Sequence, residues 1–107
     1  MKKALFNQFA SMVAASYMLG NKKVLFQRTK RQDIVDARQM VWYLCIQRGL
    51  SLADIIRMMA DSGLPLKHPA VINGIRKVEG RVNSDLDYKD FVEKIQNLVK
   101  IREEQPI

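Results

Sequence analysis

The chain has few of the residues that build disulfide frameworks, metal cages or rigid loops. Among its 107 residues there are one cysteine, one histidine and three prolines. The single cysteine, Cys45, excludes an internal disulfide and a cysteine-based zinc site, so the sequence fits a reducing cytoplasm. Cys45 lies in an apolar helical stretch, and we expect it to pack in the core.

Long hydrophobic runs are also missing. The segment "ALFNQFASMVAASYML" follows two lysines as the core of a signal peptide would, but Asn7, Gln8 and Ser11 interrupt it. No stretch reaches the ~20 apolar residues that a membrane span needs. We therefore expect neither secretion nor a membrane partner.

Residue groupings typical of enzymes are absent as well. His68 has no second histidine, cysteine or paired carboxylate near it in the sequence, which argues against a metal site. Ser51 is better placed as a helix cap than as a nucleophile, and no Gly-rich phosphate loop ending in Lys and Ser or Thr occurs. We expect no catalytic activity, metal, cofactor or small-molecule substrate.

Positive charge is plentiful, and it is concentrated in one part of the chain. The net charge is +7, and seven of the 18 basic residues precede the first acid, Asp33. The other eleven basic residues balance the eleven acids. The excess lies in the first 32 residues, and one-signed clustering of this kind creates a local field that attracts phosphates.

Apolar spacing predicts an all-α domain that spans residues 1–107. The period of 3.6 residues indicates a first helix over 3–19 and a second over 33–48, with Asp33 as N-cap and Gly49 as the stop. Between them, "NKKVLFQRTKRQ" is expected to form a loop or a single helical turn. Ser51 and Asp54 form a predicted capping box for a third helix that ends near Asp61.

Two more helices are expected after the break "SGLPLK". The fourth has Pro69 in its first turn, where the missing N–H has no partner to lose, and then an apolar stripe. The fifth is predicted over 86–103. Its inward residues are expected to be Leu86, Phe91, Ile95 and Leu98.

The third and fourth helices, joined by a Gly-containing break, have the order of a helix-turn-helix unit. The stretches "ARQMVWYLC", "GLSLADIIRMM" and "KHPAVINGIRKVEG" resemble the C-terminal DNA-binding domain of the bacterial replication initiator DnaA, over about residues 10–100. The matching residues are Arg38, Gln39, Met40, Ser51, Leu52, Ile55, His68 and Ile75 to Glu79. The resemblance implies a bundle of five or six helices of the DnaA domain IV or Trp-repressor type that contains a helix-turn-helix.

The resemblance also implies roles in binding double-stranded DNA. The basic loop would enter the minor groove through Lys30, with Arg28 and Arg31 beside it, and Arg38 would contact phosphate. The start of the third helix and that of the fourth would contact phosphates and base edges, through Leu52, Ala53, Lys67, His68, Pro69 and Ala70. Gln39, Asn73 and Lys77 complete the set of candidate DNA contacts.

The chain departs from the family pattern at the recognition helix. The family has Asp-His-Thr-Thr where this chain has Lys67, His68, Pro69 and Ala70, so an acid and two hydroxyls are replaced while cationic charge increases. About four extra residues lengthen the preceding turn, and there is no ATPase phosphate loop. These changes favour phosphate contact over base recognition.

Two further functions remain open on the sequence alone. The loss of base-contacting groups is compatible with a protein-interaction module of the same fold that binds a replication initiator or itself. The basic first helix is compatible with attachment to anionic lipid. The DNA-binding hypothesis requires the cationic segment before Asp33 and the start of the helix at Pro69 to lie on one surface.

Overall fold

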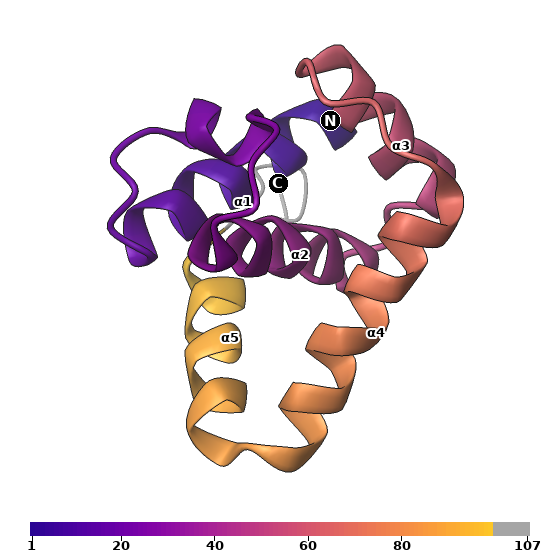
Figure 1. The fold of residues 1–107 in the computed structure, drawn as a ribbon. Coiled ribbons are helices and arrows are strands. Elements are labelled where there is room, and N and C mark those ends of the chain that lie inside the picture. The colour runs from indigo at the N-terminus through magenta and orange to yellow at the C-terminus, as the bar shows by residue number, and fades with distance from the viewer. Residues whose placement is uncertain (100–107) are drawn as a thin grey trace, which may run out of the picture.

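The structure is a computed structural model that describes residues 1–99, and within this range it is built of helices without a β-strand. Figure 1 shows α2 crossing the centre of the molecule, with α1 and α3 on one side of it and the pair α4 and α5 on the other. The all-α prediction is confirmed. The elements are α1 (Lys2–Ser16), the 3-10 helix η1 (Lys22–Phe26), α2 (Gln32–Gln47), α3 (Leu52–Asp61), α4 (His68–Ser84) and α5 (Leu86–Leu98).

The core lies where α1, α2 and α3 meet. It is filled by large side chains that are less than 2 % exposed, among them Phe6, Phe9, Leu44, Ile55 and Met59. Cys45 is fully buried among them, as its sequence context predicts, and burial raises the pKa of its thiol to about 12. Cys45 is therefore a packing residue.

Three helices end in the same hydrogen-bonded turn, the Schellman motif. In each, the amide of a leucine donates to the carbonyl five residues earlier: Leu19 to Ala14, Leu50 to Cys45 and Leu64 to Met59, at 2.9 to 3.0 Å. The residue before each leucine must adopt a left-handed conformation, which glycine adopts without steric cost.

The left-handed residue is a glycine in two of these turns and a methionine in the third. Gly49 has φ of +96° and Gly63 has φ of +104°, whereas Met18 at the end of α1 has φ of +57°. Met18 is the one non-glycine residue with a positive φ among residues 1–99, and its side chain is 91 % exposed.

The prediction for the fifth helix is partly wrong. Its inward residues are Tyr88, Val92 and Ile95, while Leu86 is 76 % and Leu98 is 56 % exposed. The turn between α4 and α5, after which α5 begins at Leu86, lies at the end of this helix pair away from α1 and α3 (Figure 1). The helix ends at Leu98 and not at 103, because Val99 is extended; the predicted residues 100–103 lie outside the described range.

The prediction for the start of α2 also needs correction. Arg31 takes the N-cap position in an extended conformation, and Asp33 lies inside the first turn. The Asp33 carboxylate accepts two hydrogen bonds from the Arg31 guanidinium, at 2.8 and 3.2 Å. The helix dipole still stabilises an acid in the first turn. The sequence therefore predicted the right turn for the start of α2 but the wrong N-cap residue.

Candidate nucleic-acid interface

The start of α4 is exposed, and no side chain of the protein caps it. Lys67 is the N-cap in an extended conformation and makes no side-chain cap hydrogen bond, and Pro69 lies in the first turn as predicted. Lys67, His68, Pro69 and Ala70 are all exposed. The partial positive charge of the helix end therefore faces outward beside the Lys67 ammonium, which is the arrangement that favours an anion.

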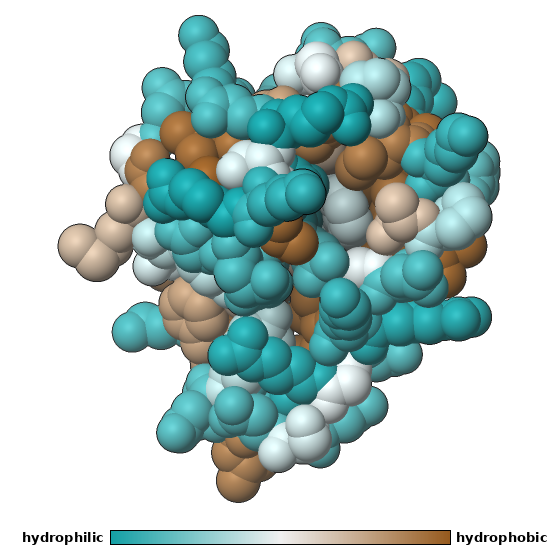
Figure 2. Space-filling model, in the orientation of Figure 1, coloured by the Kyte–Doolittle hydropathy of each residue, from teal (hydrophilic) through white to brown (hydrophobic). Residues whose placement is uncertain are grey.

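The exposed side of α4 continues along the helix from this end. Asn73 and Lys77 follow Ala70 at intervals of three and four residues and are exposed, whereas Val71, Gly74 and Val78 face the core. In the orientation of Figure 1, hydrophilic residues cover most of the surface over α2 and α4 (Figure 2). Four of the expected contacts, from Pro69 to Lys77, thus lie on one exposed helix face.

The basic loop precedes α2. Arg28 and Lys30 are exposed, and Arg31 is exposed but paired with Asp33, with 2.8 Å between Arg31 Nη2 and Asp33 Oδ2. This pair raises the pKa of Arg31 and lowers that of Asp33, mainly through their side-chain hydrogen bond. Arg28 and Lys30 therefore offer the less compensated charge of this loop.

Arg38, the residue expected to contact phosphate, is directed into the protein. It is 8 % exposed, its Nε donates to the Leu25 carbonyl at 2.7 Å, and its Nη2 donates to the Gln27 carbonyl at 2.8 Å. Burial, with a smaller contribution from the charge of Arg28, lowers the pKa of Arg38. In this structure Arg38 fixes the chain that leads into the basic loop, because its donors bond main-chain oxygens. A phosphate contact by Arg38 stays a prediction.

The remaining candidates lie partly inside the fold. Gln39 is half-buried between α2 and α4, where it lines a cavity of about 50 Å³ together with Lys77 and Arg81. Leu52, the first residue of α3, is half-buried and packs against the core. The structure thus brings Gln39 and Lys77 together and leaves Leu52 with a largely structural position.

The basic loop and the start of α4 do not form the one continuous surface that the sequence-based DNA-binding hypothesis required, so that expectation is wrong. The basic loop precedes α2, whereas the start of α4 lies beside the opposite end of α2 (Figure 1). A helix of 16 residues is about 24 Å long at 1.5 Å per residue. The candidate contacts therefore divide into two groups. The loop group is Arg28, Lys30 and Arg31, and the helix group at the start and along the exposed face of α4 is Lys67, His68, Pro69, Ala70, Asn73 and Lys77.

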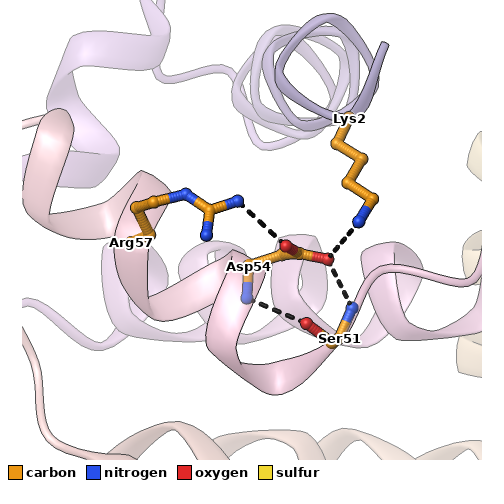
Figure 3. Close-up of polar contacts among 4 residues, drawn as sticks. All are labelled: Lys2, Ser51, Asp54 and Arg57. Carbon is orange, nitrogen blue, oxygen red and sulfur yellow. Dashed lines mark hydrogen bonds and ion pairs between the residues drawn. The ribbon is translucent and has the colours of Figure 1, made fainter.

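A buried carboxylate, that of Asp54, fixes the start of α3. Asp54 is 6 % exposed and completes the predicted capping box: its Oδ2 accepts from the Ser51 amide at 3.0 Å, and Ser51 Oγ accepts from the Asp54 amide at 3.0 Å. Lys2 Nζ from α1 lies 3.2 Å and Arg57 Nη2 lies 2.9 Å from the same carboxylate (Figure 3). These contacts hold the start of α3 against α1.

The carboxylate of Asp54 should make stability depend on pH. The hydrogen bond from the Ser51 amide, then that with the Ser51 side chain, and then Lys2 and Arg57 lower its pKa well below the ordinary value of 3.8. A carboxyl group with a lowered pKa in the folded state stabilises the fold above its unfolded pKa, and this stabilisation is lost as the pH falls toward the folded pKa. We expect Asp54→Asn to lower the melting temperature by several degrees at pH 7, and by progressively less as the pH falls below about 4 toward the folded pKa.

Asp61→Asn is the matched control, because Asp61 is an exposed acid on the same helix. Thermal unfolding followed by circular dichroism at pH 7, 5 and 3 makes the comparison. An Asp54→Asn deficit that is as large at pH 3 as at pH 7 would contradict the assigned role.

Several residues that position the interface were not found from the sequence. Arg48 Nη2 donates to the Gln96 carbonyl at 2.8 Å and to the Val99 carbonyl, which secures the end of α5. Lys2 reaches Asp54 from the other end of the chain. These contacts join residues about 50 positions apart, and no local pattern indicates them. The capping box was found because its two members are three residues apart.

Within residues 1–99, no three or more His, Cys, Asp and Glu side chains are grouped so that they could hold a metal ion. No helix in the same range is long and apolar enough to cross a bilayer. Comparisons with protein-family models, with curated proteins and with solved structures found no match. The resemblance to the DnaA domain therefore stays a prediction.

Proposed function

We propose that the chain binds double-stranded DNA, as a regulator of replication or transcription, through the loop group and the helix group. The observation that carries the proposal is the exposed start of α4, where Lys67 and His68 flank a helix end that no side chain caps. The helix dipole at such an end favours a phosphate oxygen. The main-chain contribution is small, because Pro69 has no N–H and the Ala70 amide donates to the Lys67 carbonyl at 3.1 Å. The exposed Arg28 and Lys30 supply the second contact.

Because the two groups lie at opposite ends of α2, the proposal requires a contact that spans two grooves. Successive turns of B-DNA are about 34 Å apart, so a minor groove and the neighbouring major groove are offset by about half of that. The length of α2, about 24 Å, is similar to this offset between neighbouring grooves, and α2 separates the loop group from the helix group. In this arrangement α4 contacts the major groove and its edge, while the loop group contacts the adjacent backbone or minor groove.

The contacts on α4 favour affinity over sequence recognition. Pro69 has no amide hydrogen and Ala70 has no polar side-chain atom, so among the exposed contacts on α4 His68 and Asn73 are the ones with both a donor and an acceptor for a base edge. Lys67 and Lys77 contribute charge that any sequence satisfies. We therefore expect modest sequence preference on top of a strong electrostatic contribution.

The expected result is an affinity for duplex DNA that falls steeply with salt. Each phosphate contact contributes about 0.9 to the slope of log K against log salt, so Lys30→Gln should reduce the slope by about one. Fluorescence anisotropy with a random-sequence duplex at several salt concentrations measures it. Lys89→Gln, an exposed lysine on α5, is the control and should leave the slope unchanged. An affinity that does not depend on salt would exclude the proposal.

The alternative is a protein-interaction module, and it is favoured by the absence of hydroxyl and carboxylate groups at the start of α4. The same variants separate the two functions. If Lys30→Glu abolishes the biological activity, DNA binding is supported. If Lys30→Glu leaves the activity intact while substitutions on an apolar surface abolish it, the interaction module is supported.

A further inference from the structure

Arg81, near the end of α4, has a fixed position and unused hydrogen-bond donors. Its guanidinium carbon lies 4.1 Å from the centre of the Tyr88 ring, and Tyr88 belongs to α5 and is 6 % exposed. Contact with the face of an aromatic ring restricts an arginine side chain. Within residues 1–99, the Arg81 guanidinium makes no hydrogen bond or ion pair with another protein group. A guanidinium has five N–H donors, so the exposed Arg81 is held in place and free to bind an anion.

Arg81 extends the exposed row of the helix group by one turn. It follows Lys77 by four residues, as Lys77 follows Asn73, and all three side chains are exposed. Residues four apart lie on the same face of a helix. The row therefore continues from the start of α4 to its last turn, where no sequence motif had indicated a contact.

Measured along α2, Arg81 lies between the two groups of candidate contacts. Gly74 lies against Trp42 in the second half of α2, whereas Arg81, about two turns further along α4, lines the same cavity as Asp36. Asp36 is in the second turn of α2, about 6 Å from the end that follows the loop group. α4 therefore leads from the far end of α2 back toward the loop group.

The cavity at this point offers donors from both helices. Gln39 of α2 and Lys77 and Arg81 of α4 line it, and its volume is about 50 Å³. Pockets for small molecules measure about 300–1,000 Å³, so this one suits a single charged group. The planar guanidinium of an arginine matches two oxygens of a phosphate, and the lysine ammonium and glutamine amide add further donors.

We propose that Arg81 binds the sugar–phosphate strand that separates the two grooves, and that Tyr88 is its positioning residue. This inference rests on the proposed function, in which the helix group contacts a major groove and the loop group contacts the adjacent backbone or minor groove. A protein that contacts neighbouring grooves must cross the strand between them. Arg81 lies at that crossing, because it follows the helix group along α4 and reaches the half of α2 next to the loop group.

The acid beside the cavity favours a phosphate of a duplex over a free anion. Asp36 also lines the cavity, and its Oδ1 accepts from Gln32 Nε2 at 2.8 Å. A free phosphate ion meets two cations, Lys77 and Arg81, opposed by one carboxylate. A phosphate of a duplex is brought to the same place by the loop group and the helix group, which raises its effective concentration. The partner of this site is therefore the backbone of double-stranded DNA.

Arg81→Gln should lower the slope of log K against log salt by about one and weaken duplex binding several-fold at low salt. Arg76→Gln is the matched control. Arg76 is an exposed arginine five residues earlier, about 140° around the helix from Arg81, and its loss should change the slope much less. Fluorescence anisotropy with a random-sequence duplex measures both. If Lys30→Gln lowers the slope and Arg81→Gln does not, this inference is wrong and the proposed function stands. A wild type without salt-dependent binding overturns both.

Tyr88→Leu tests the positioning role through a double-mutant cycle with Arg81→Gln. Leucine removes the ring that faces the guanidinium, so Tyr88→Leu should weaken duplex binding about threefold when Arg81 is present and have no further effect when it is absent. Tyr88→Phe keeps the ring and should bind as the wild type does. Binding is measured at a temperature where circular dichroism shows each variant folded. Equal losses in both backgrounds would mean that Tyr88 acts on the fold alone, and its positioning role would be wrong.

Asp36→Asn gives a readout of opposite sign. Asparagine keeps an acceptor for Gln32 and removes the charge, so duplex affinity should rise several-fold if a phosphate lies beside position 36. Asp61→Asn, at an exposed position of α3, is the control and should have a smaller effect. Equal effects of the two substitutions contradict the site. A melting temperature that inorganic phosphate raises for the wild type but not for Arg81→Gln, at constant ionic strength and with equal duplex binding, would assign the site to free phosphate and overturn the proposal.

Discussion

Gly74→Ala should lower the free energy of unfolding by about 2–3 kcal/mol, because one methyl group does not fit between α2 and α4. A Cβ at Gly74 would lie 2.6 Å from Cζ3 and 2.8 Å from Cε3 of Trp42, and 2.9 Å from Cγ of Gln39. The Trp42 ring is 3 % exposed, so it cannot move aside without disturbing the core. The two helices would have to separate where the Gly74 backbone approaches Trp42.

Gly80→Ala is a matched control on the same helix. A Cβ at Gly80 meets nothing within 4 Å, and alanine is favoured over glycine inside a helix. This variant should therefore stabilise the protein by about 0.5–1 kcal/mol. Urea unfolding of the wild type and both variants measures the difference, and equal effects of the two substitutions would contradict the close approach at Gly74.

The same pair of variants bears on DNA binding. The position of α4 against α2 sets the distance between the helix group and the loop group, so a shift of α4 should weaken a contact that uses both. We expect Gly74→Ala to reduce duplex affinity at a temperature where it is still folded, and Gly80→Ala to retain it. Retained affinity in a folded Gly74→Ala protein would show that the two groups need not be held at a fixed distance.

The helices could be predicted from the sequence because the signals that define them are local. Ser51 and Asp54 are three residues apart, Pro69 fixes its own φ, and Gly49 occupies the left-handed position that ends α2. Each of these acts within one helical turn. A physical rule that involves neighbours in the chain can be applied without knowing the tertiary structure.

Predictions that depended on tertiary contacts were less successful. The period of α5 placed Leu86 and Leu98 with the inward residues, but the helix packs through Tyr88, Val92 and Ile95. Which apolar stripe of α5 faces the core depends on where α1, α2 and α4 lie. The spacing of apolar residues alone does not specify those positions. The same reason applies to Arg38: a basic residue near the start of a helix indicates either an exposed contact or a buried anchor, and the contacts with Leu25 and Gln27 that favour the anchor could not be predicted from the local sequence.

Arg38→Met should distinguish an anchor of the basic loop from a phosphate contact. Methionine keeps much of the apolar volume but removes both donors, so the Leu25 and Gln27 carbonyls lose their partners. Hydrogen bonds from a charged donor contribute about 1.5–3 kcal/mol each, so we expect a loss of about 3 kcal/mol in the free energy of unfolding. Faster amide hydrogen exchange should accompany it in η1 and the loop that follows.

Arg31→Met is the matched control for this substitution. Arg31 is exposed and bonds Asp33 two residues away, so its removal should leave the stability nearly unchanged. If Arg38 anchors the loop, Arg38→Met lowers stability and weakens DNA binding because Arg28 and Lys30 are no longer held in place. If Arg38→Met instead leaves stability unchanged and lowers the salt slope by about one, its guanidinium turns outward to a phosphate when DNA binds, and the anchor role is wrong.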